Sequence, residues 1–217
     1  MKRTIKWNIA QKAELKWWQQ YLKGKDVEAY HTWKRAYWQG ILDKIAGSAP
    51  IREGMSILDA GCGPAGMFMQ LPNCNVDALD PLLDEYEKNL PHFKPSMYAN
   101  TTFHALPLEQ YQTDKQYDIV FCMNAINHVS DIAFSYDLLA KMVKPGGKLV
   151  VSIDAHNHNF FKHLFRMIPG DILHPHQYDL KEYSAFITDR NCRILQTEKL
   201  KHEFFFDHYV QVAQKIS

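Results

Sequence analysis

A glycine-rich turn in the first third of the chain has the spacing of a nucleotide-binding site. The run ILDAGCGPAG places Gly61, Gly63 and Gly66 in the pattern G-x-G-x-x-G, in which glycine permits a tight turn and close approach of a ligand to the backbone. Pro64 is expected at the first position of a helix, whose free N–H groups suit ligand acceptors. The glycine spacing alone does not distinguish a dinucleotide site from a site for another nucleoside or from a turn that binds no ligand.

Two carboxylates discriminate between these ligands. Asp80 stands at the end of the next expected strand, where a carboxylate accepts hydrogen bonds from the hydroxyls of an adenosine-type ribose. Asp59 stands two residues before the first glycine, where its charge is expected to repel a pyrophosphate and to attract an ammonium or sulfonium group. S-adenosylmethionine carries both cations beside a ribose and an adenine, so these residues favour it over NAD.

The segment LDAGCGPAG, followed by Asp80, resembles the class I S-adenosylmethionine-dependent methyltransferases, and specifically their small-molecule branch. The resemblance covers about residues 50–155 in ordered motifs and extends more loosely to FFFDHYVQVAQK near the C-terminus. It implies an α/β fold with a Rossmann-like, doubly wound sheet of seven strands. That sheet is mostly parallel with an antiparallel last strand, and helices cover both faces.

The resemblance also implies which residues bind the cofactor, S-adenosyl-L-methionine. Asp59, Gly61 and Gly63 form the turn around its methionine part, and Asp80 binds the ribose. The other expected cofactor positions are Cys62 in the turn, Pro81 and Leu82 beside the adenine, His104, Ala105 and Leu106 where the family contacts the adenine ring, and Asn124 after the fourth strand. The family often has an acidic residue where this chain has His104.

Histidines are the candidate catalytic residues, because methyl transfer needs proximity, dry walls and in some enzymes a base. Imidazole titrates near neutrality, so a general base is expected among His128, His156 and His176. The pairs HNH and HPH follow the fifth strand, where His158 and His174 are expected to contact the substrate. Ordinary pocket or surface roles with hydrogen-bonded rings are the main expectation for these histidines, ahead of the general base, and a divalent metal is the last alternative. No metal ligand is assigned, since the chain lacks C-x-x-C and H-E-x-x-H.

Residues 1–50 are expected to form a helical segment ahead of the sheet. One interpretation of this segment is a lid over the cofactor. Its second helix begins after Asp26 and carries an aromatic stripe that includes Tyr30, Trp33 and Trp38. Such stripes are commonly core, whereas a lid excludes water and presents aromatic faces to a substrate. These three aromatic residues are therefore the candidate substrate contacts.

The first 25 residues carry seven basic side chains and one acid, Glu14, which gives a local charge of +6 interleaved with tryptophans. A solvated face of an amphipathic helix is the main expectation. An anionic substrate, a membrane surface or RNA are the alternatives.

Short β-rich runs alternate with helical stretches in residues 51–217, which indicates a parallel sheet with crossover helices. The expected strands are Met55–Ala60, Val76–Leu79, Thr102–His104, Tyr117–Met123 and Lys148–Ile153, then Arg193–Lys199 and Phe204–Ala213 as a hairpin. The expected helices are Met67–Leu71, Leu82–Asn89, Ile132–Val143 and Leu180–Asp189. A Pro-Gly-Gly turn is expected before the fifth strand, and a substrate-side insertion at about 155–180.

Composition limits the remaining classes. The 217 residues are 46% hydrophobic, enough for one domain with a buried core. A net charge of +1 disfavours nucleic acid as a partner. No apolar run approaches the ~18 residues of a membrane span. The scattered cysteines, which form no C-x-x-C pair, favour a cytoplasmic protein. The main prediction is a methyltransferase that acts on a small molecule. An NAD(P)-dependent oxidoreductase and a non-catalytic nucleoside-binding module remain alternatives, and the oligomeric state stays open.

Overall fold

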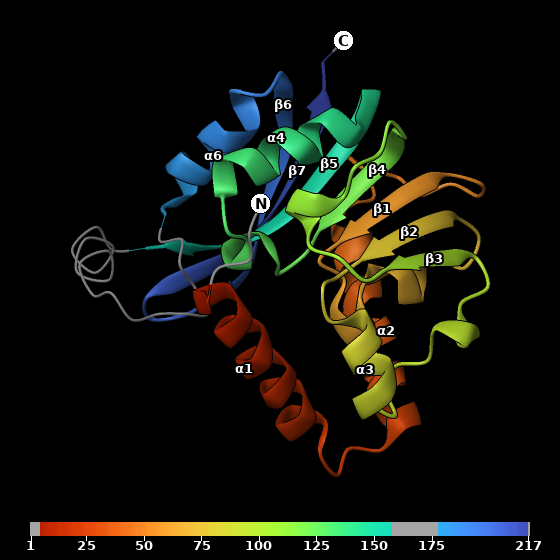
Figure 1. Cartoon of the computed structure of the whole chain (residues 1–217). Coiled ribbons are helices and arrows are strands. Elements are labelled where there is room, and N and C mark those ends of the chain that lie inside the picture. Colours follow the sequence, from red (N-terminus) through yellow and green to blue (C-terminus); the bar gives the residue numbers. More distant parts are fainter. Residues whose placement is uncertain (1–4, 158–177, 217) are drawn as a thin grey trace.

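The computed structural model describes residues 5–157 and 178–216. The described residues form a seven-stranded sheet flanked by helices (Figure 1). The strands are β1 (Ser56–Ala60), β2 (Asn75–Leu79), β3 (Thr101–His104), β4 (Tyr117–Cys122), β5 (Val143–His156), β6 (Cys192–His202) and β7 (Phe206–Lys215). The α-helices are α1 (Ile5–Leu22), α2 (Val27–Ile45), α3 (Leu83–Asn89), α4 (Ile132–Met142) and α6 (Leu180–Thr188).

The strand order is β3-β2-β1-β4-β5-β7-β6, and β1 to β5 run parallel. β7 runs antiparallel to both of its neighbours, β5 and β6. The chain leaves β1 towards β2 and later returns to the other side of β1 for β4. Ligands of doubly wound sheets bind at the carboxyl ends of the strands where the order reverses in this way. The predicted fold is confirmed.

Alternate residues of the central strands face two separate cores, because successive side chains of a strand point to opposite sides. Ile57 and Phe121 pack with residues of α2 and α3, whereas Leu58 and Val120 pack with residues of α4 and α6. Burying a side chain of this kind contributes ~1.5–3 kcal/mol. Since helices cover both faces, a ligand must approach the sheet at its edge.

The predicted helix after the glycine turn differs from the observed structure. Two short 3₁₀ helices, η1 (Gly63–Ala65) and η2 (Met67–Gln70), replace it. Gly66 separates them because its backbone is extended, with φ −81° and ψ −171°. Pro64 therefore lies in a single 3₁₀ turn, and no regular α-helix begins there.

The predicted Pro-Gly-Gly turn also differs, since it lies inside β5. This strand begins at Val143 and pairs there with Tyr117 of β4. The register then shifts, so that Lys148 pairs with Ile119. Such a bulge accommodates the extra residues without ending the strand.

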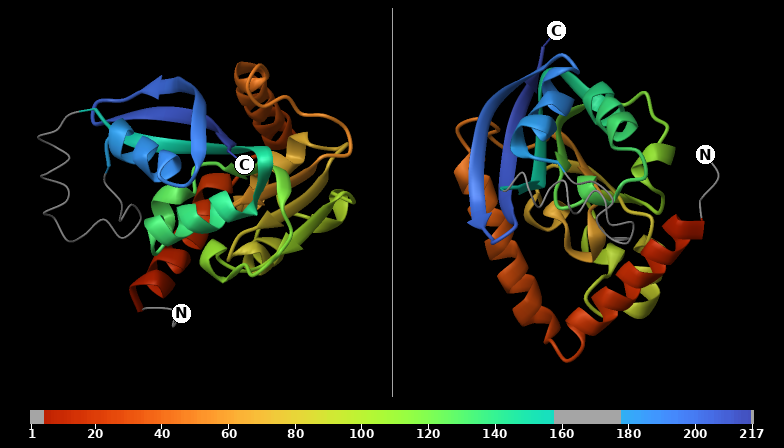
Figure 2. Two further views of the ribbon diagram at one scale, coloured as in Figure 1. Left: turned by 90° about the horizontal axis from the view of Figure 1, so that it is seen from above. Right: turned by 90° about the vertical axis from the view of Figure 1, so that its left-hand side faces the viewer.

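The N-terminal segment consists of two helices that diverge from a short loop, as two views agree (Figures 1 and 2). Asp26 caps α2 as predicted, because its side chain accepts the N–H of Ala29 at 2.9 Å. Among the helices of residues 5–157 and 178–216, none has the length and apolar character that a membrane span requires. Most of the predicted insertion at 155–180 lies outside the described residues.

Candidate functional site

The glycine turn follows β1, and steric demands explain its spacing. Gly61 has a φ of +73°, and a Cβ there would lie 2.3 Å from the Cβ of Ala125. Gly63 has a φ of +57°, in the region that favours glycine. A Cβ on Gly66 would lie 2.5 Å from a carboxylate oxygen of Asp59. The backbone of this turn is therefore held closely against its neighbours.

Asp59 lies beneath the turn. Its side chain is 1% exposed, and its carboxylate accepts the backbone N–H of Phe68 at 3.0 Å. Burial raises the pKa of Asp59 to about 7, although hydrogen bonds and the Lys34 ammonium oppose this rise. This carboxylate holds the chain that follows the turn, and it does not line the cavity described below.

Asp80 follows β2 and is fixed by two backbone donors. Its Oδ2 accepts the N–H of Gly63 at 3.0 Å, and its Oδ1 accepts the N–H of Leu82 at 2.9 Å. Burial and the nearby Glu14 carboxylate raise the pKa of Asp80. A carboxylate has about four acceptor sites, so each oxygen keeps capacity for a further donor.

A cavity of about 660 Å³ lies at the carboxyl ends of β1, β2 and β4, a size typical of small-molecule sites. Its sheet wall consists of Ala60, Gly61, Cys62, Gly63, Ala65, Leu79, Asp80, Pro81, Cys122, Met123, Asn124 and Ala125. Its helical wall consists of Gln11, Glu14, Trp17, Trp18, Tyr21, Tyr30, Trp33, Lys34 and Trp38. Pro107, Leu108, Glu109, His128 and Val129 complete it. The glycine turn and the N-terminal helices thus bound one space.

Asn124 is held on this wall in a conformation that is uncommon for residues other than glycine, with φ +54°. Its N–H donates to Ser152 Oγ at 2.6 Å, and that hydroxyl donates to Asn124 Oδ1 at 2.9 Å. Backbone conformations of this kind concentrate at functional sites. The geometry therefore marks the end of β4 as part of the site.

Comparison with known proteins assigns this architecture. A family profile described as a methyltransferase domain matches residues 30–204, which is most of the chain. The chain belongs to this methyltransferase family. The resemblance to the class I S-adenosylmethionine-dependent methyltransferases, which was based on the glycine turn and Asp80, is confirmed.

Curated relatives include two ubiquinone biosynthesis O-methyltransferases. The relative from Acinetobacter baylyi is 29% identical over 160 residues, which cover 72% of this chain and 63% of the relative. The relative from Rhizobium rhizogenes is 32% identical over 145 residues, which cover 63% of this chain and 57% of the relative. The matches therefore span less than two thirds of the length of these relatives.

A solved structure supports the fold. The 1,6-didemethyltoxoflavin-N1-methyltransferase of Burkholderia thailandensis, with bound 1,6-didemethyltoxoflavin and S-adenosylhomocysteine, has a TM-score of 0.68 and 13% identity. The alignment covers 100% of this chain and 92% of that chain. At this identity the likeness shows the fold alone.

The methyltransferase brings only some of its predicted cofactor residues to the cavity. Gly61, Cys62, Gly63, Asp80, Pro81 and Asn124 line it, whereas Asp59, Leu82, His104, Ala105 and Leu106 do not. Leu82 is a core residue and serves through its N–H on Asp80. The loop after β3 instead lines the cavity with Pro107, Leu108 and Glu109. An acidic side chain is therefore present, five residues beyond His104.

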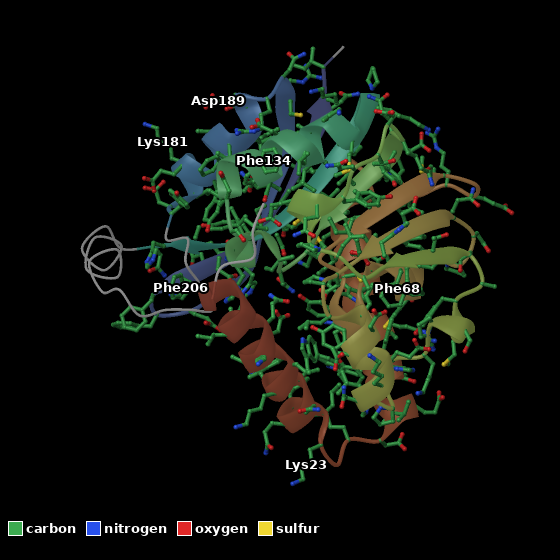
Figure 3. All side chains as sticks on the ribbon, in the orientation of Figure 1. Lys23, Phe68, Phe134, Lys181, Asp189 and Phe206 are labelled. Atoms are coloured by element: carbon green, nitrogen blue, oxygen red, sulfur yellow. The ribbon has the colours of Figure 1, made fainter. Side chains whose placement is uncertain are left out.

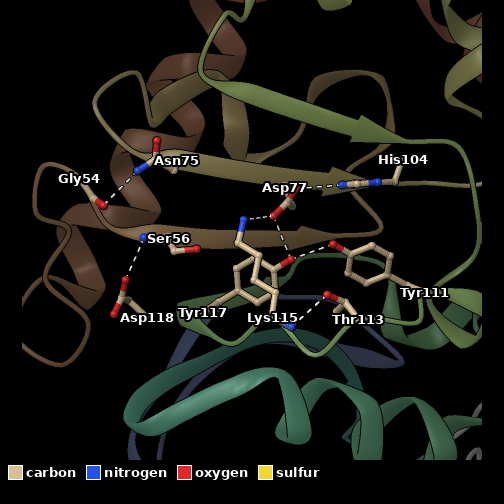
Figure 4. A network of polar contacts seen from close by, with 10 residues as sticks. All are labelled: Gly54, Ser56, Asn75, Asp77, His104, Tyr111, Thr113, Lys115, Tyr117 and Asp118. Carbon is tan, nitrogen blue, oxygen red and sulfur yellow. Dashed lines mark hydrogen bonds and ion pairs between the residues drawn. The ribbon is translucent and has the colours of Figure 1, made fainter.

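His104 belongs to a polar network on the sheet (Figure 4). Its Nε2 lies 2.8 Å from Asp77 Oδ1, while Tyr117 donates to Asp77 Oδ2 at 2.9 Å and Lys115 pairs with the same oxygen. Burial opposes the ionisation of Asp77, but these hydrogen bonds outweigh it and lower its pKa. His104 thus joins β3 to β2, and its partner on another strand explains the difference from the prediction.

Among the described residues of this methyltransferase, His128 is the one predicted base that lines the cavity. It ends the 3₁₀ helix η5 (Ile126–His128) directly after β4. The proposed base His176 lies outside the described residues, as do the proposed substrate contacts His158 and His174.

His156 is buried at the end of β5, with its ring 4.5 Å from the ring of Phe206. Figure 3 shows Phe206 across the molecule from Phe68, the residue held beneath the glycine turn. His156 does not line the cavity. This placement gives no support to His156 as the base.

The predicted aromatic contacts all line the cavity, but they differ in burial. Tyr30 and Trp38 are 5% and 3% exposed, whereas Trp33 is 52% exposed. The Trp38 indole donates to the carbonyl of Ala65 at 3.0 Å, which ties α2 to the turn. The stripe therefore serves as core at one side and as cavity wall at the other.

Lys34 is a wall residue that the sequence pattern did not single out. Its Nζ lies 4.4 Å from the ring centroid of Trp38 and 4.8 Å from that of Tyr37, within the range of cation–π attraction. Burial lowers its pKa to about 8, although the charge of Asp59 opposes this change. Lys34 thus places a cation on the cavity wall, among aromatic rings.

α1 has the predicted solvated face, and its other face forms part of the cavity wall. Lys12 and Lys16 are exposed, but the opposite side of the helix lines the cavity with Gln11, Glu14, Trp17, Trp18 and Tyr21. The sequence contained a signal for this inner face, because Glu14 and Trp18 are four residues apart and therefore lie on the same side of a helix. A sequence alone does not reveal which partner that face meets.

Proposed function

We propose that this methyltransferase transfers the methyl group of S-adenosylmethionine to a hydroxyl oxygen of a small, partly apolar aromatic molecule in the cytoplasm. The observation that carries the proposal is the shared cavity, with the glycine turn and Asp80 on one wall and aromatic side chains on the other. The name O-methyltransferase of the curated relatives supports oxygen as the attacked atom. Enclosure by two helices favours a small acceptor over nucleic acid.

The sheet wall fits the donor. Asp80 has acceptor capacity for ribose hydroxyls, and the strained turn at Gly61 and Gly63 leaves room for the methionine part. Lys34 supplies a cation for the carboxylate of that part, and the aromatic rings of α2 attract a sulfonium through their faces. Glu109 is an acceptor for the adenine amino group at the position that His104 leaves open.

The helical wall and η5 fit the acceptor. When bound, S-adenosylmethionine would supply a methyl group that an oxygen nucleophile attacks in line, so that the O–C bond forms as the S–C bond breaks and S-adenosylhomocysteine leaves. His128 lines the cavity, which supports it as the base that holds the proton lost by the acceptor hydroxyl. Trp17 and Trp33 form the apolar side of the acceptor site. α1 and α2 exclude water from the reacting atoms.

Calorimetric titration tests the donor assignment. The wild-type protein is expected to bind S-adenosylhomocysteine but not NADH. Asp80→Ala is expected to bind S-adenosylhomocysteine about 100-fold more weakly, since the ribose loses a charged hydrogen-bond acceptor and the turn loses the carboxylate that binds the Gly63 N–H. The matched control is Asp84→Ala, at an exposed position of α3 outside the cavity. Binding of NADH alone would overturn the proposal in favour of an oxidoreductase.

A methylation screen tests the acceptor assignment. Hydroxylated aromatic compounds are incubated with the protein and S-adenosylmethionine labelled in the methyl group, and products are identified by mass spectrometry. A labelled methyl ether is the expected product. Binding of S-adenosylhomocysteine without methylation of any tested compound would favour a non-catalytic nucleoside-binding module.

A further inference from the structure

Two carboxylates share the part of the cavity that lies at the end of β2. Asp80 belongs to the sheet wall and Glu14 to α1, and both line the cavity. Burial raises the pKa of Glu14, and its charge in turn helps to raise that of Asp80. Carboxylates that interact in a poorly solvated site repel each other. A molecule with hydrogen-bond donors for both relieves that repulsion.

Glu14 is fixed at this end of the cavity by neighbouring side chains. The Tyr86 hydroxyl of α3 donates to Glu14 Oε1 over a long 3.4 Å, and a polar interaction with Trp18 also opposes the rise of the Glu14 pKa. The Trp18 ring lies 3.7 Å from the position of a Cβ on Gly63, whose N–H is bound to Asp80. Glu14 therefore faces the same corner of the turn as Asp80.

A second polar side chain on α1 points to a ligand here. Gln11 lies one turn before Glu14 and also lines the cavity. Its Oε1 is buried and has no hydrogen-bond partner among the described residues. A buried acceptor of this kind costs free energy until a donor reaches it. The inner face of α1 thus presents two acceptors to the cavity.

We propose that Glu14 is a second ribose-binding residue, so that the two adjacent hydroxyls of the methyl donor bridge Glu14 of α1 and Asp80 of the sheet. This inference rests on the proposed function. A ribose supplies two O–H donors, and each carboxylate accepts one in a charge-assisted hydrogen bond. Gln11 is an acceptor for a further donor of the same nucleoside. The donor then joins the helical wall to the sheet wall.

Titration with modified nucleosides tests this assignment. The probes are S-adenosylhomocysteine and its 2′-deoxy and 3′-deoxy analogues, and the proteins are wild type, Glu14→Ala and Gln19→Ala. Gln19→Ala is the matched control because Gln19 is exposed on α1 and does not line the cavity. Glu14→Ala is expected to bind S-adenosylhomocysteine about ten-fold more weakly, while the control binds unchanged.

The analogues separate a ribose contact from a general loosening of α1. The analogue that lacks the hydroxyl bound by Glu14 is expected to bind wild type and Glu14→Ala equally. Loss of affinity by the same factor for all three probes would overturn the inference, as would undiminished binding of S-adenosylhomocysteine by Glu14→Ala. Neither result affects the donor assignment of the proposed function, which fails if the wild-type protein binds no S-adenosylhomocysteine.

Discussion

The two walls of the cavity are built differently. The sheet wall is mainly backbone, held by close contacts such as that between Gly61 and Ala125 and by fixed acceptors such as Asp80. The helical wall is made of large side chains, and Trp17 and Trp33 remain half exposed. We therefore expect the rigid turn to serve the methyl donor, which the family shares. Exposed side chains of the helical wall such as Trp17 and Trp33 are expected to serve the acceptor, because their replacement leaves that turn intact.

The largest effect is expected where the sheet wall is tightest. Gly61→Ala combines a positive φ with a Cβ 2.3 Å from that of Ala125, so the free energy of unfolding should fall by about 3–4 kcal/mol. Gly24→Ala is the control, because Gly24 has φ +75° but no atom within 4 Å of its Cβ position. It should cost about 1 kcal/mol. Equal losses in urea unfolding would show that the tight contact is unimportant.

The next effect concerns chemistry at the boundary between the walls. His128→Ala should lower kcat by about 100-fold, the usual contribution of a general base, while affinity for S-adenosylhomocysteine stays constant. His202→Ala, which removes an exposed histidine of β6, should leave kcat unchanged. A His128→Ala enzyme with wild-type kcat would exclude this histidine as the base.

The sheet wall should also respond to pH. Burial raises the pKa of Asp59 to about 7 from an ordinary value of 3.8, so the folded protein keeps a proton that the unfolded chain releases between these values. The free energy of unfolding should therefore fall, by about 3 kcal/mol, as the pH rises from 4 to 7. The pKa values of Asp80 and Glu14 are also raised, so both residues also lower the free energy of unfolding as the pH rises.

Thermal unfolding of ligand-free protein across this range provides the measurement. Asp59→Asn should flatten the decline, whereas Asp84→Asn, at an exposed position, should not. A decline of the same slope in Asp59→Asn would assign it to the other two carboxylates.

The smallest effect is expected on the helical wall. Trp33→Ala should change the free energy of unfolding by less than about 0.5 kcal/mol, because half of the side chain is already exposed. It should nevertheless raise the KM for the acceptor about five-fold through lost apolar contact. A rise in the dissociation constant of S-adenosylhomocysteine instead would indicate that Trp33 contacts the methyl donor, and would contradict the expected difference between the two walls.

The sequence predicted the parts of this molecule that depend on local patterns. Apolar runs mark the strands, and the glycine spacing with Asp80 marks the donor site, because both follow from the conformations of a few neighbouring residues. The orientation of Asp59 was not predictable in this way, since it depends on the two 3₁₀ turns that replace a regular helix. His104 and Glu14 depend on partners in other elements, Asp77 and Asp80.

α1 has a consequence for the timing of the reaction. The helix ends near Gly24, a residue with φ +75° and open space around it, and its inner face forms part of the cavity wall. A displacement of α1 about this residue would widen the cavity, and we expect such a displacement to accompany the departure of the products. Departure of S-adenosylhomocysteine is then expected to be slowed by contacts that hold α1 against the sheet.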